Sequence, residues 1–246
     1  VQELNERLAA GNFDVAKGSF HAAIRLSREI GVFRSGAALG FGVGPLLLAA
    51  ADTGPPRHDW IDRSGRSRPC RVLCPGEATT AHLLYRLFHG VGEVEQAVFS
   101  EIMPALRSGA ADYGVCIHEG RFTWEREGLV RIADLGETWE AQTGVPLPLG
   151  GIFGRLSLGA EILSKVQQTI RDSVEFGLAH RDQTLPTMRR YAQEFDDQVL
   201  LAHVDLYVNR WTVDLGDEGA EALVKLDELG RAAGLIAANL PPLRLL

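Results

Sequence analysis

Short apolar runs alternate with amphipathic stretches from residue 13 to residue 156, and this alternation constrains the fold more than any other feature. Apolar runs of about four to eight residues are typical of buried strands, whereas longer amphipathic stretches are typical of helices. Strands and helices that alternate along a chain favour a mostly parallel sheet with helices packed on it. The sequence therefore predicts an α/β fold.

The expected elements follow from this alternation. The strands are expected at Phe13–Ala16, Phe33–Leu39, Pro45–Ala51, Val72–Cys74, Val94–Phe99, Ala111–Ile117, Leu129–Ala133 and Leu147–Phe153. The helices between them are expected at Phe20–Ile30, Thr79–Phe88, Ser100–Arg107 and Glu119–Glu127. Residues 52–69 are rich in proline, glycine and arginine and hold almost no apolar residue, which indicates a surface loop.

Beyond residue 156 the pattern becomes helical throughout. An apolar residue recurs every four positions, which predicts one long amphipathic helix. These residues are Leu158, Ile162, Val166, Ile170, Val174 and Leu178. Further helices are expected at Leu185–Phe195, Gln198–Val208 and Glu218–Ala233.

Residues 74–148 form a compact α/β unit in this pattern, inserted between two parts of another. We therefore expect two lobes, one made of residues 1–73 and 149–246 and the other of residues 74–148. Two lobes joined by two crossovers predict a cleft between them.

The start of the chain is unusual, because it begins at Val1 rather than Met. Leu4 and Leu8 have helical spacing, but no N-cap residue precedes them. We therefore expect the chain to lack a strand and a turn ahead of this helix, and a signal peptide cannot be scored as absent.

The composition excludes several classes of protein. Lys and Arg number 25 against 32 Asp and Glu, a net charge of −7, which argues against nucleic-acid and anionic-membrane partners. No apolar run approaches the roughly 18 residues of a membrane span. Three cysteines are too few for a disulfide scaffold, and they are interpreted as the thiols of a cytoplasmic protein. Cys70 and Cys74 have no second pair at ligand spacing, so no metal site is predicted.

The segment Gly40-Phe41-Gly42-Val43-Gly44-Pro45 is glycine-rich. A dinucleotide fingerprint requires a helix directly after its glycines, whereas Pro45 and an apolar run follow here. Nucleotide binding is therefore not predicted. Either the backbone around Gly42 passes close to a ligand, or the glycines form a bulge or a hairpin turn.

Thr79 and Thr80 lie at an expected strand-to-helix junction after Pro75-Gly76. Hydroxyl groups beside the free N–H groups of a helix start can bind an anion. Capping of the helix alone would explain one of the two threonines, so the two interpretations stay open.

His118 ends an expected strand and precedes an expected helix. Ligand sites in open α/β sheets lie at the carboxyl ends of strands, and a histidine with an ordinary pKa near 6.5 can take a proton at neutral pH. The alternative is that His118 only caps the helix or pairs with Glu119.

Several motifs together resemble a known family. They are Lys17–Ala22, Arg34–Gly36, Leu39–Pro45, Pro75-Gly76 with Thr79–Ala81, Ile117–Glu119, Leu147–Gly151, and Tyr207–Asn209 with Gly216 and Glu218-Gly219. In this order and at these intervals they resemble the 1,4-dihydroxy-6-naphthoate synthases of the futalosine route to menaquinone. The resemblance extends from Val1 to Leu235.

The resemblance implies a two-lobed fold like the type II periplasmic binding proteins, with central mixed sheets and a C-terminal helical segment. It also implies a carbon–carbon lyase without a cofactor, which converts the anionic small molecule cyclic dehypoxanthine futalosine to 1,4-dihydroxy-6-naphthoate.

His118 matches the family's catalytic histidine, while Ser19 and Thr80, with Thr79 beside it, match positions that contact the substrate. The turn at Gly42 lines the same cleft. The family's N-terminal strand and its Asn-Asp-Thr loop have no counterpart, so part of the active site is expected to be missing.

Three alternatives share this fold. They are a sister enzyme such as a chorismate dehydratase, a non-catalytic solute-binding protein, and the effector domain of a transcription regulator. His118 at a strand end favours an enzyme, because a transport receptor has no need for a base there.

Overall fold

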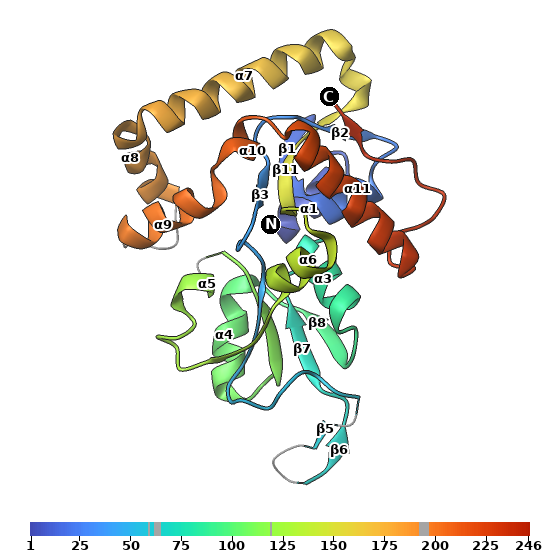
Figure 1. Cartoon of the computed structure of the whole chain (residues 1–246), viewed down its shortest axis with the longest axis vertical. Helices are drawn as coiled ribbons and strands as arrows, with labels where there is room; N and C mark the ends of the chain where they lie inside the picture. The colour runs from blue at the N-terminus through green and yellow to red at the C-terminus, as the bar shows by residue number, and fades with distance from the viewer. Residues whose placement is uncertain (59, 62–64, 119, 192–196) are drawn as a thin grey trace. The chain divides into compact units, whose positions relative to one another are not determined.

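A computed structural model describes residues 1–58, 60–61, 65–118, 120–191 and 197–246 (Figure 1). The chain forms two compact units. The first comprises Val1, Glu3–Val43 and Val145–Leu246, and the second comprises Gln2 and Gly44–Gly144.

The first crossover between the units therefore lies between Val43 and Gly44, whereas the sequence pattern placed it after residue 73. The reason is β4 (Leu46–Ala49), which pairs with β9 (Tyr113–Cys116) and β10 (Val130–Asp134) as an interior strand of the second sheet. The return crossover lies at residues 144–145, a few residues before the predicted boundary at 148–149. Residues 44–73 thus move from the first lobe of the prediction to the second unit.

The first unit is built on a mixed sheet. Its strands are β1 (Val15–Ser19), β2 (Ile30–Val32), β3 (Ala38–Gly40), β11 (Leu147–Arg155) and β12 (Arg244–Leu245). β11 pairs antiparallel with β1, β2 and β3, and β12 joins β2 in parallel. The prediction of a mostly parallel sheet is wrong for this unit: β1 and β2 point the same way, but β11 lies between them and runs in the opposite direction.

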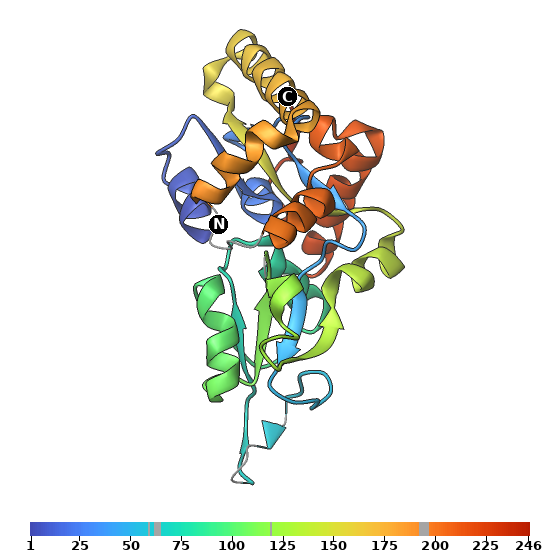
Figure 2. The ribbon, with the colours of Figure 1, turned by 90° about the vertical axis from the view of Figure 1, so that its left-hand side faces the viewer.

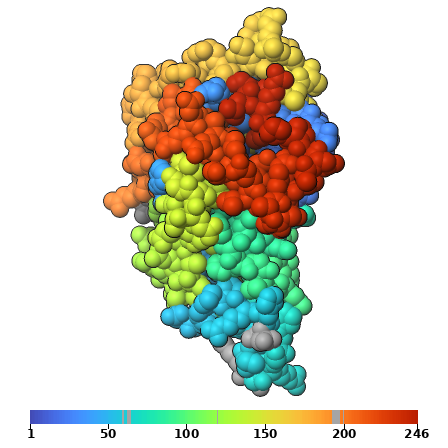
Figure 3. All heavy atoms as spheres, turned by 45° about the vertical axis from the view of Figure 1, so that its right-hand side comes forward, coloured from blue at the N-terminus to red at the C-terminus, as the bar shows by residue number. Residues whose placement is uncertain are grey.

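Helices complete the first unit. They are α1 (Gln2–Ala9), α2 (Phe20–Arg25), α7 (Ala160–Ala179), α8 (Arg181–Tyr191), α9 (Asp197–Tyr207), α10 (Arg210–Val213) and α11 (Gly216–Ala232). The long helix predicted from the four-residue repeat is α7, which lies at the surface of the unit and buries only Leu163 (Figure 3). The predicted helix Phe20–Ile30 ends early, because its last residue already belongs to β2. The predicted helix Leu185–Phe195 reaches residues 192–196, which lie outside the described residues.

The second unit contains a sheet with the strand order β10-β4-β9-β7-β8, in which β7 is Arg71–Cys74 and β8 is Glu93–Gln96. β7 runs parallel to β8 and β9, while β4 runs antiparallel to β9 and β10. Helix α4 (Phe99–Ser108) packs against β7 and β9 (Figure 2). The remaining helices are α3 (Thr80–Phe88), α5 (Gly120–Thr123) and α6 (Leu135–Thr143). The sequence pattern made α5 too long and did not predict α6.

Two short strands, β5 (Trp60–Ile61) and β6 (Ser67–Arg68), pair within the segment predicted as a surface loop. Across the described ranges, no helix is long and apolar enough to cross a membrane.

Candidate active site

Ser19 and the glycine turn lie at one edge of the first unit's sheet. Ser19 ends β1 and pairs with Gly150, while Gly40 ends β3 and pairs with Leu147 at the start of β11. Because β1 and β3 both run antiparallel to β11, their carboxyl ends lie at the same edge. The structure thus brings the segment of Gly42 to the edge that holds Ser19.

Ser19 is buried and is held by a residue that the sequence analysis did not identify. The Ser19 N–H donates to Asn5 Oδ1 at 2.9 Å, and Asn5 Nδ2 donates to Ser19 Oγ at 3.1 Å. Asn5 is 1% exposed and Ser19 4%. The available signal was the spacing of Asn5 and Leu8, which places an amide on the buried face of α1.

The glycine segment makes a turn and then passes close to the chain itself. Gly42 has a φ of +69°, a conformation that side-chain-bearing residues rarely adopt, and the space beside it is open. At Gly44, a Cβ atom would lie 2.2 Å from the backbone nitrogen of Gly136. Position 44 therefore requires glycine because the backbone there packs directly against the first turn of α6.

Thr79, Thr80 and His118 share an edge of the second unit's sheet. Thr79 and Thr80 follow β7, and His118 follows β9. Since β7 and β9 are parallel neighbours, their carboxyl ends lie side by side. This is the edge of an open α/β sheet at which ligands bind.

Thr79 caps α3. Its Oγ1 accepts a hydrogen bond from the His82 N–H at 3.2 Å and donates its own hydrogen to Gly76 O at 2.6 Å. Thr80 begins the helix and, like Thr79, is 2% exposed. The hydroxyl of Thr79 is engaged within the fold, which matches the capping interpretation for one of the two threonines.

His118 lies in a tight turn between β9 and α5. Its φ is +54°, and it is the only residue other than glycine with a positive φ in the described part of the chain. Such strained residues cluster at functional sites. The ring of Phe99, at the start of α4, packs edge-on against the imidazole with the ring centres 5.2 Å apart. Glu119, the predicted alternative partner, lies outside the described residues.

A buried ion pair anchors the helix that follows His118. Arg121 donates to Asp134 Oδ2 at 2.7 Å and to Gly44 O at 2.6 Å, and the Asp134 side chain is fully buried. Asp134 also caps α6 by accepting from the Gly136 N–H at 2.8 Å. Arg121 therefore connects the turn of His118 to the segment just before β4 and to the end of β10. The sequence context of Arg121 and Asp134 did not reveal this role.

Residues 1–232 match a family model described as menaquinone biosynthesis. The chain belongs to this family. Over 244 residues it is 39% identical to a 1,4-dihydroxy-6-naphtoate synthase of Thermus thermophilus, covering 99% of this chain and 85% of the relative. Over 234 residues it is 40% identical to a 1,4-dihydroxy-6-naphtoate synthase of Streptomyces coelicolor, covering 93% and 79%.

Solved structures agree on the fold of this menaquinone biosynthesis family member. Protein AF1704 from Archaeoglobus fulgidus superposes with a TM-score of 0.86 at 29% identity, covering 96% of this chain and 85% of that chain. The periplasmic aliphatic sulphonate binding protein SsuA from Escherichia coli superposes with a TM-score of 0.61 at 12% identity, covering 97% and 81%. The predicted fold class, α/β with mixed sheets and like the periplasmic binding proteins, is confirmed.

All three cysteines of this chain are buried in the second unit, and none forms a disulfide with another. Burial raises the pKa of Cys74 and of Cys116 to about 12. Because the thiolate is the reactive form, neither thiol is suited to nucleophilic attack or metal binding at neutral pH. Among the described residues, no three histidine, cysteine or acidic side chains gather at a spacing that could hold a metal ion.

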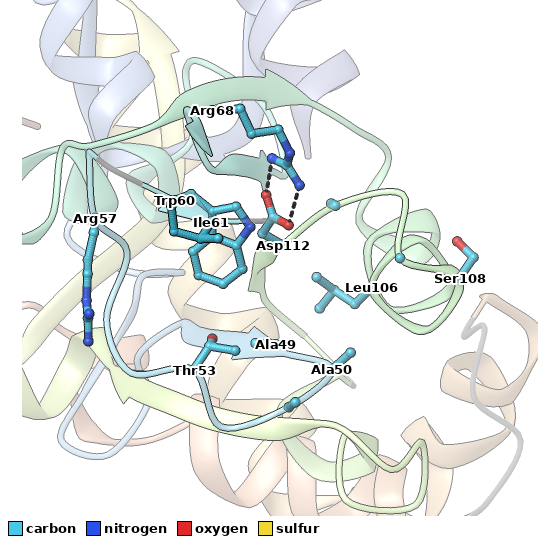
Figure 4. A pocket seen from close by; sticks show the side chains of 13 residues that line it. Ala49, Ala50, Thr53, Arg57, Trp60, Ile61, Arg68, Leu106, Ser108 and Asp112 are labelled. Atoms are coloured by element: carbon cyan, nitrogen blue, oxygen red, sulfur yellow. Dashed lines mark hydrogen bonds and ion pairs between the residues drawn. The ribbon is translucent and has the colours of Figure 1, made fainter. Parts of the chain in front are cut away.

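A cavity of about 760 Å³ lies at the opposite edge of the second unit's sheet, where β4 ends and β9 begins (Figure 4). Arg68 and Asp112 form a two-pronged ion pair in its wall, with N–O distances of 2.7 and 2.8 Å. Trp60 lines the same cavity and packs edge-on against Tyr113. None of the predicted site residues lines this cavity, so it is separate from the edge that carries His118.

Proposed function

We propose that this chain is a 1,4-dihydroxy-6-naphthoate synthase, a carbon–carbon lyase that converts cyclic dehypoxanthine futalosine to 1,4-dihydroxy-6-naphthoate. The observation that carries the proposal is the identity of 39% and 40%, over nearly the whole chain, to two proteins of that name. The motifs that carry the resemblance include the candidate site residues, which supports the same assignment.

His118 is the general base of the proposed reaction. In its neutral form it removes a proton from the bound bicyclic substrate, after which the sugar-derived ring opens and a small polyol fragment leaves. Formation of the aromatic naphthalene ring drives the loss. Base catalysis of this kind is worth a factor of about 10²–10⁴ in rate.

The other candidate residues bind and orient the substrate in this proposal. These residues are Ser19, the turn at Gly42, and Thr80 with the capped helix start at Thr79. Hydroxyl and N–H groups donate hydrogen bonds to the substrate's carboxylate and bind its sugar hydroxyls. These local donors allow an anionic substrate to bind although the chain carries a net charge of −7.

The turn of His118 supports its role as a base. The left-handed backbone and the edge-on contact with Phe99 restrict where the imidazole can lie. A catalytic group held in one position contributes to rate because the reacting atoms meet without further ordering.

Incubation of the purified chain with cyclic dehypoxanthine futalosine tests the proposal directly. We expect 1,4-dihydroxy-6-naphthoate to form and a chelator to leave the rate unchanged, since the resemblance implies no cofactor. A parallel incubation with chorismate tests the sister enzyme. Turnover of chorismate alone would assign the chain to that activity, and tight binding without turnover of either compound would indicate a solute-binding protein.

A further inference from the structure

The amide of Asn5 is fixed in one orientation by Ser19. The Ser19 N–H donates to Asn5 Oδ1 at 2.9 Å, so the other end of the amide, Nδ2, faces Ser19 Oγ at 3.1 Å. An amide nitrogen can only donate hydrogen bonds. Ser19 Oγ is therefore the acceptor in this second bond.

The hydroxyl hydrogen of Ser19 consequently points elsewhere. A serine hydroxyl has one hydrogen to donate, and the bond from Asn5 does not use it. Within the part of the chain that the structure describes, the one hydrogen bond of the Ser19 hydroxyl is the bond that its oxygen accepts from Asn5 Nδ2. Because Ser19 is only 4% exposed, its hydroxyl hydrogen has little access to bulk water.

The side chain of Ser19 does not cap the helix that follows it. Ser19 is the N-cap of α2, with an extended backbone at φ −84° and ψ 147°, yet its side chain accepts no hydrogen bond from the helix. Serine is favoured at N-caps because its oxygen normally accepts from the first turn. Here the oxygen accepts from Asn5 instead, so it satisfies no N–H group in the first turn of α2.

Gly18 leaves room for this arrangement. A Cβ atom at position 18 would lie 3.0 Å from Asn5 Oδ1 and 3.2 Å from the ring of Phe153. A larger residue in β1 would therefore press on the amide that orients Ser19.

We propose that Asn5 is a positioning residue, which makes Ser19 a hydrogen-bond donor to an oxygen acceptor of the substrate, its carboxylate or a carbonyl group. The inference rests on the proposed function, and it adds a rule of selectivity to that function. A subsite in which Ser19 can only donate accepts carboxylate and carbonyl oxygens and discriminates against donor groups.

Asn5→Asp tests the inference with almost no change in shape. An aspartate still accepts from the Ser19 N–H, but its second oxygen also accepts, so it takes the hydroxyl hydrogen of Ser19. We expect KM for cyclic dehypoxanthine futalosine to rise about 10- to 100-fold, the size expected for one hydrogen bond to a charged group, with kcat within about 3-fold of wild type.

Ser19→Ala and Asn12→Asp provide the comparison. Ser19→Ala removes the donor without adding a charge, so we expect a similar rise in KM, and adding Asn5→Asp to it should change KM little further. Asn12 is exposed in the same unit, so Asn12→Asp makes the same change in charge and should leave KM unchanged. Circular dichroism and Tm confirm that each variant is folded.

Binding of 1,4-dihydroxy-6-naphthoate, measured by calorimetry, separates this inference from the proposed function. If wild type turns over substrate but folded Asn5→Asp and Ser19→Ala keep the wild-type KM, the positioning role is wrong and the function stands. If wild type is inactive but binds the naphthoate, and both variants bind it at least 10-fold more weakly, the function is wrong and the positioning role stands. If wild type neither turns over substrate nor binds the naphthoate, both are overturned.

Discussion

Two strand-to-helix junctions, one in each unit, have nearly the same backbone and use their side chains in opposite ways. Ser19 precedes α2 with φ −84° and ψ 147°, and Thr79 precedes α3 with φ −82° and ψ 148°. Thr79 caps its helix through the His82 N–H, whereas the side chain of Ser19 does not cap α2. The oxygen of Ser19 is instead held by Asn5.

The difference shows that the local backbone does not decide what an N-cap hydroxyl does. At Thr79 both the donor and the acceptor of the hydroxyl are used by its own junction, because Gly76 O lies 2.6 Å away. At Ser19 the hydroxyl oxygen accepts a hydrogen bond from Asn5 of α1, and the hydroxyl hydrogen is not used by that bond. A capping residue that does not cap is therefore the stronger candidate for contact with a substrate.

The largest expected effect concerns the second unit, in which we propose that His118 is the base. His118→Asn should lower kcat by a factor of about 10²–10⁴ and change KM little, because the base is lost while the binding groups remain. Asparagine is chosen because it tolerates a positive φ, so the turn is kept. Steady-state kinetics measures both constants.

His58→Asn is the matched control, since His58 is exposed in the same unit. It should show wild-type kinetics. A His118→Asn variant that kept wild-type kcat, or that lost activity only through KM, would remove His118 from the role of base.

The second effect concerns the ion pair that anchors the turn of His118. Arg121→Met should lower the free energy of unfolding of the second unit by about 3–5 kcal/mol, because it leaves a buried carboxylate without its partner. Arg131→Met is the control: the pair of Arg131 with Glu137 is exposed, and such pairs contribute about 0–1 kcal/mol. Urea unfolding measures both, and equal losses in the two variants would contradict the role given to Arg121.

Much of the second unit could be predicted from its sequence. The strand at 72–74 and the helix from Thr79 to Phe88 agree with β7 and α3, because a buried apolar run and an amphipathic stretch with a capping residue are local signals. Helix α6 was missed although Asp134, with Glu137 three residues later, is a local helix-start signal, because the prediction followed the apolar runs instead. The membership of β4 in the second sheet was missed because strand pairing depends on tertiary contacts, which local signals do not show.

The candidate site was predicted only in part. His118, Thr79 and Thr80 could be placed near one another, because the carboxyl ends of neighbouring parallel strands share an edge. Asn5 was missed, since a polar residue in a short amphipathic helix normally faces solvent. Its contact with Ser19, 14 positions further along the chain, exists only after α1 packs on β1.

Alkaline pH should weaken the second unit selectively, because it contains all three cysteines. Burial raises the pKa of Cys74 and of Cys116 from 9.0 to about 12. At pH 8 and below, the thiols are almost entirely neutral in both states. Between pH 9 and 12 the unfolded chain loses the protons and the folded chain does not, so stability falls by about 1.4 kcal/mol per thiol at pH 10.

Urea unfolding at pH 8 and pH 10 measures this loss. In the double variant Cys74→Ala/Cys116→Ala, the loss between the two pH values should be smaller than in wild type by about 3 kcal/mol. Tyr85 is present in both proteins, and its pKa is raised chiefly by burial and less by its neighbours Cys70 and Cys74, so the main part of its contribution cancels in the difference. Equal losses in the two proteins would show that the thiols do not ionise on unfolding in this range.

The smallest effect returns to the two junctions. Thr79→Ala should cost about 1 kcal/mol of stability, the usual value of an N-cap, and Thr79→Ser should restore most of it because serine keeps the accepting oxygen. Hydrogen exchange resolves the same point by residue: the His82 amide should exchange faster in Thr79→Ala and at the wild-type rate in Thr79→Ser. In Ser19→Ala the first-turn amides of α2 should exchange as in wild type, because the Ser19 side chain does not cap them. Faster exchange there would show that Ser19 caps α2 in solution, and the contrast between the two junctions would then be lost.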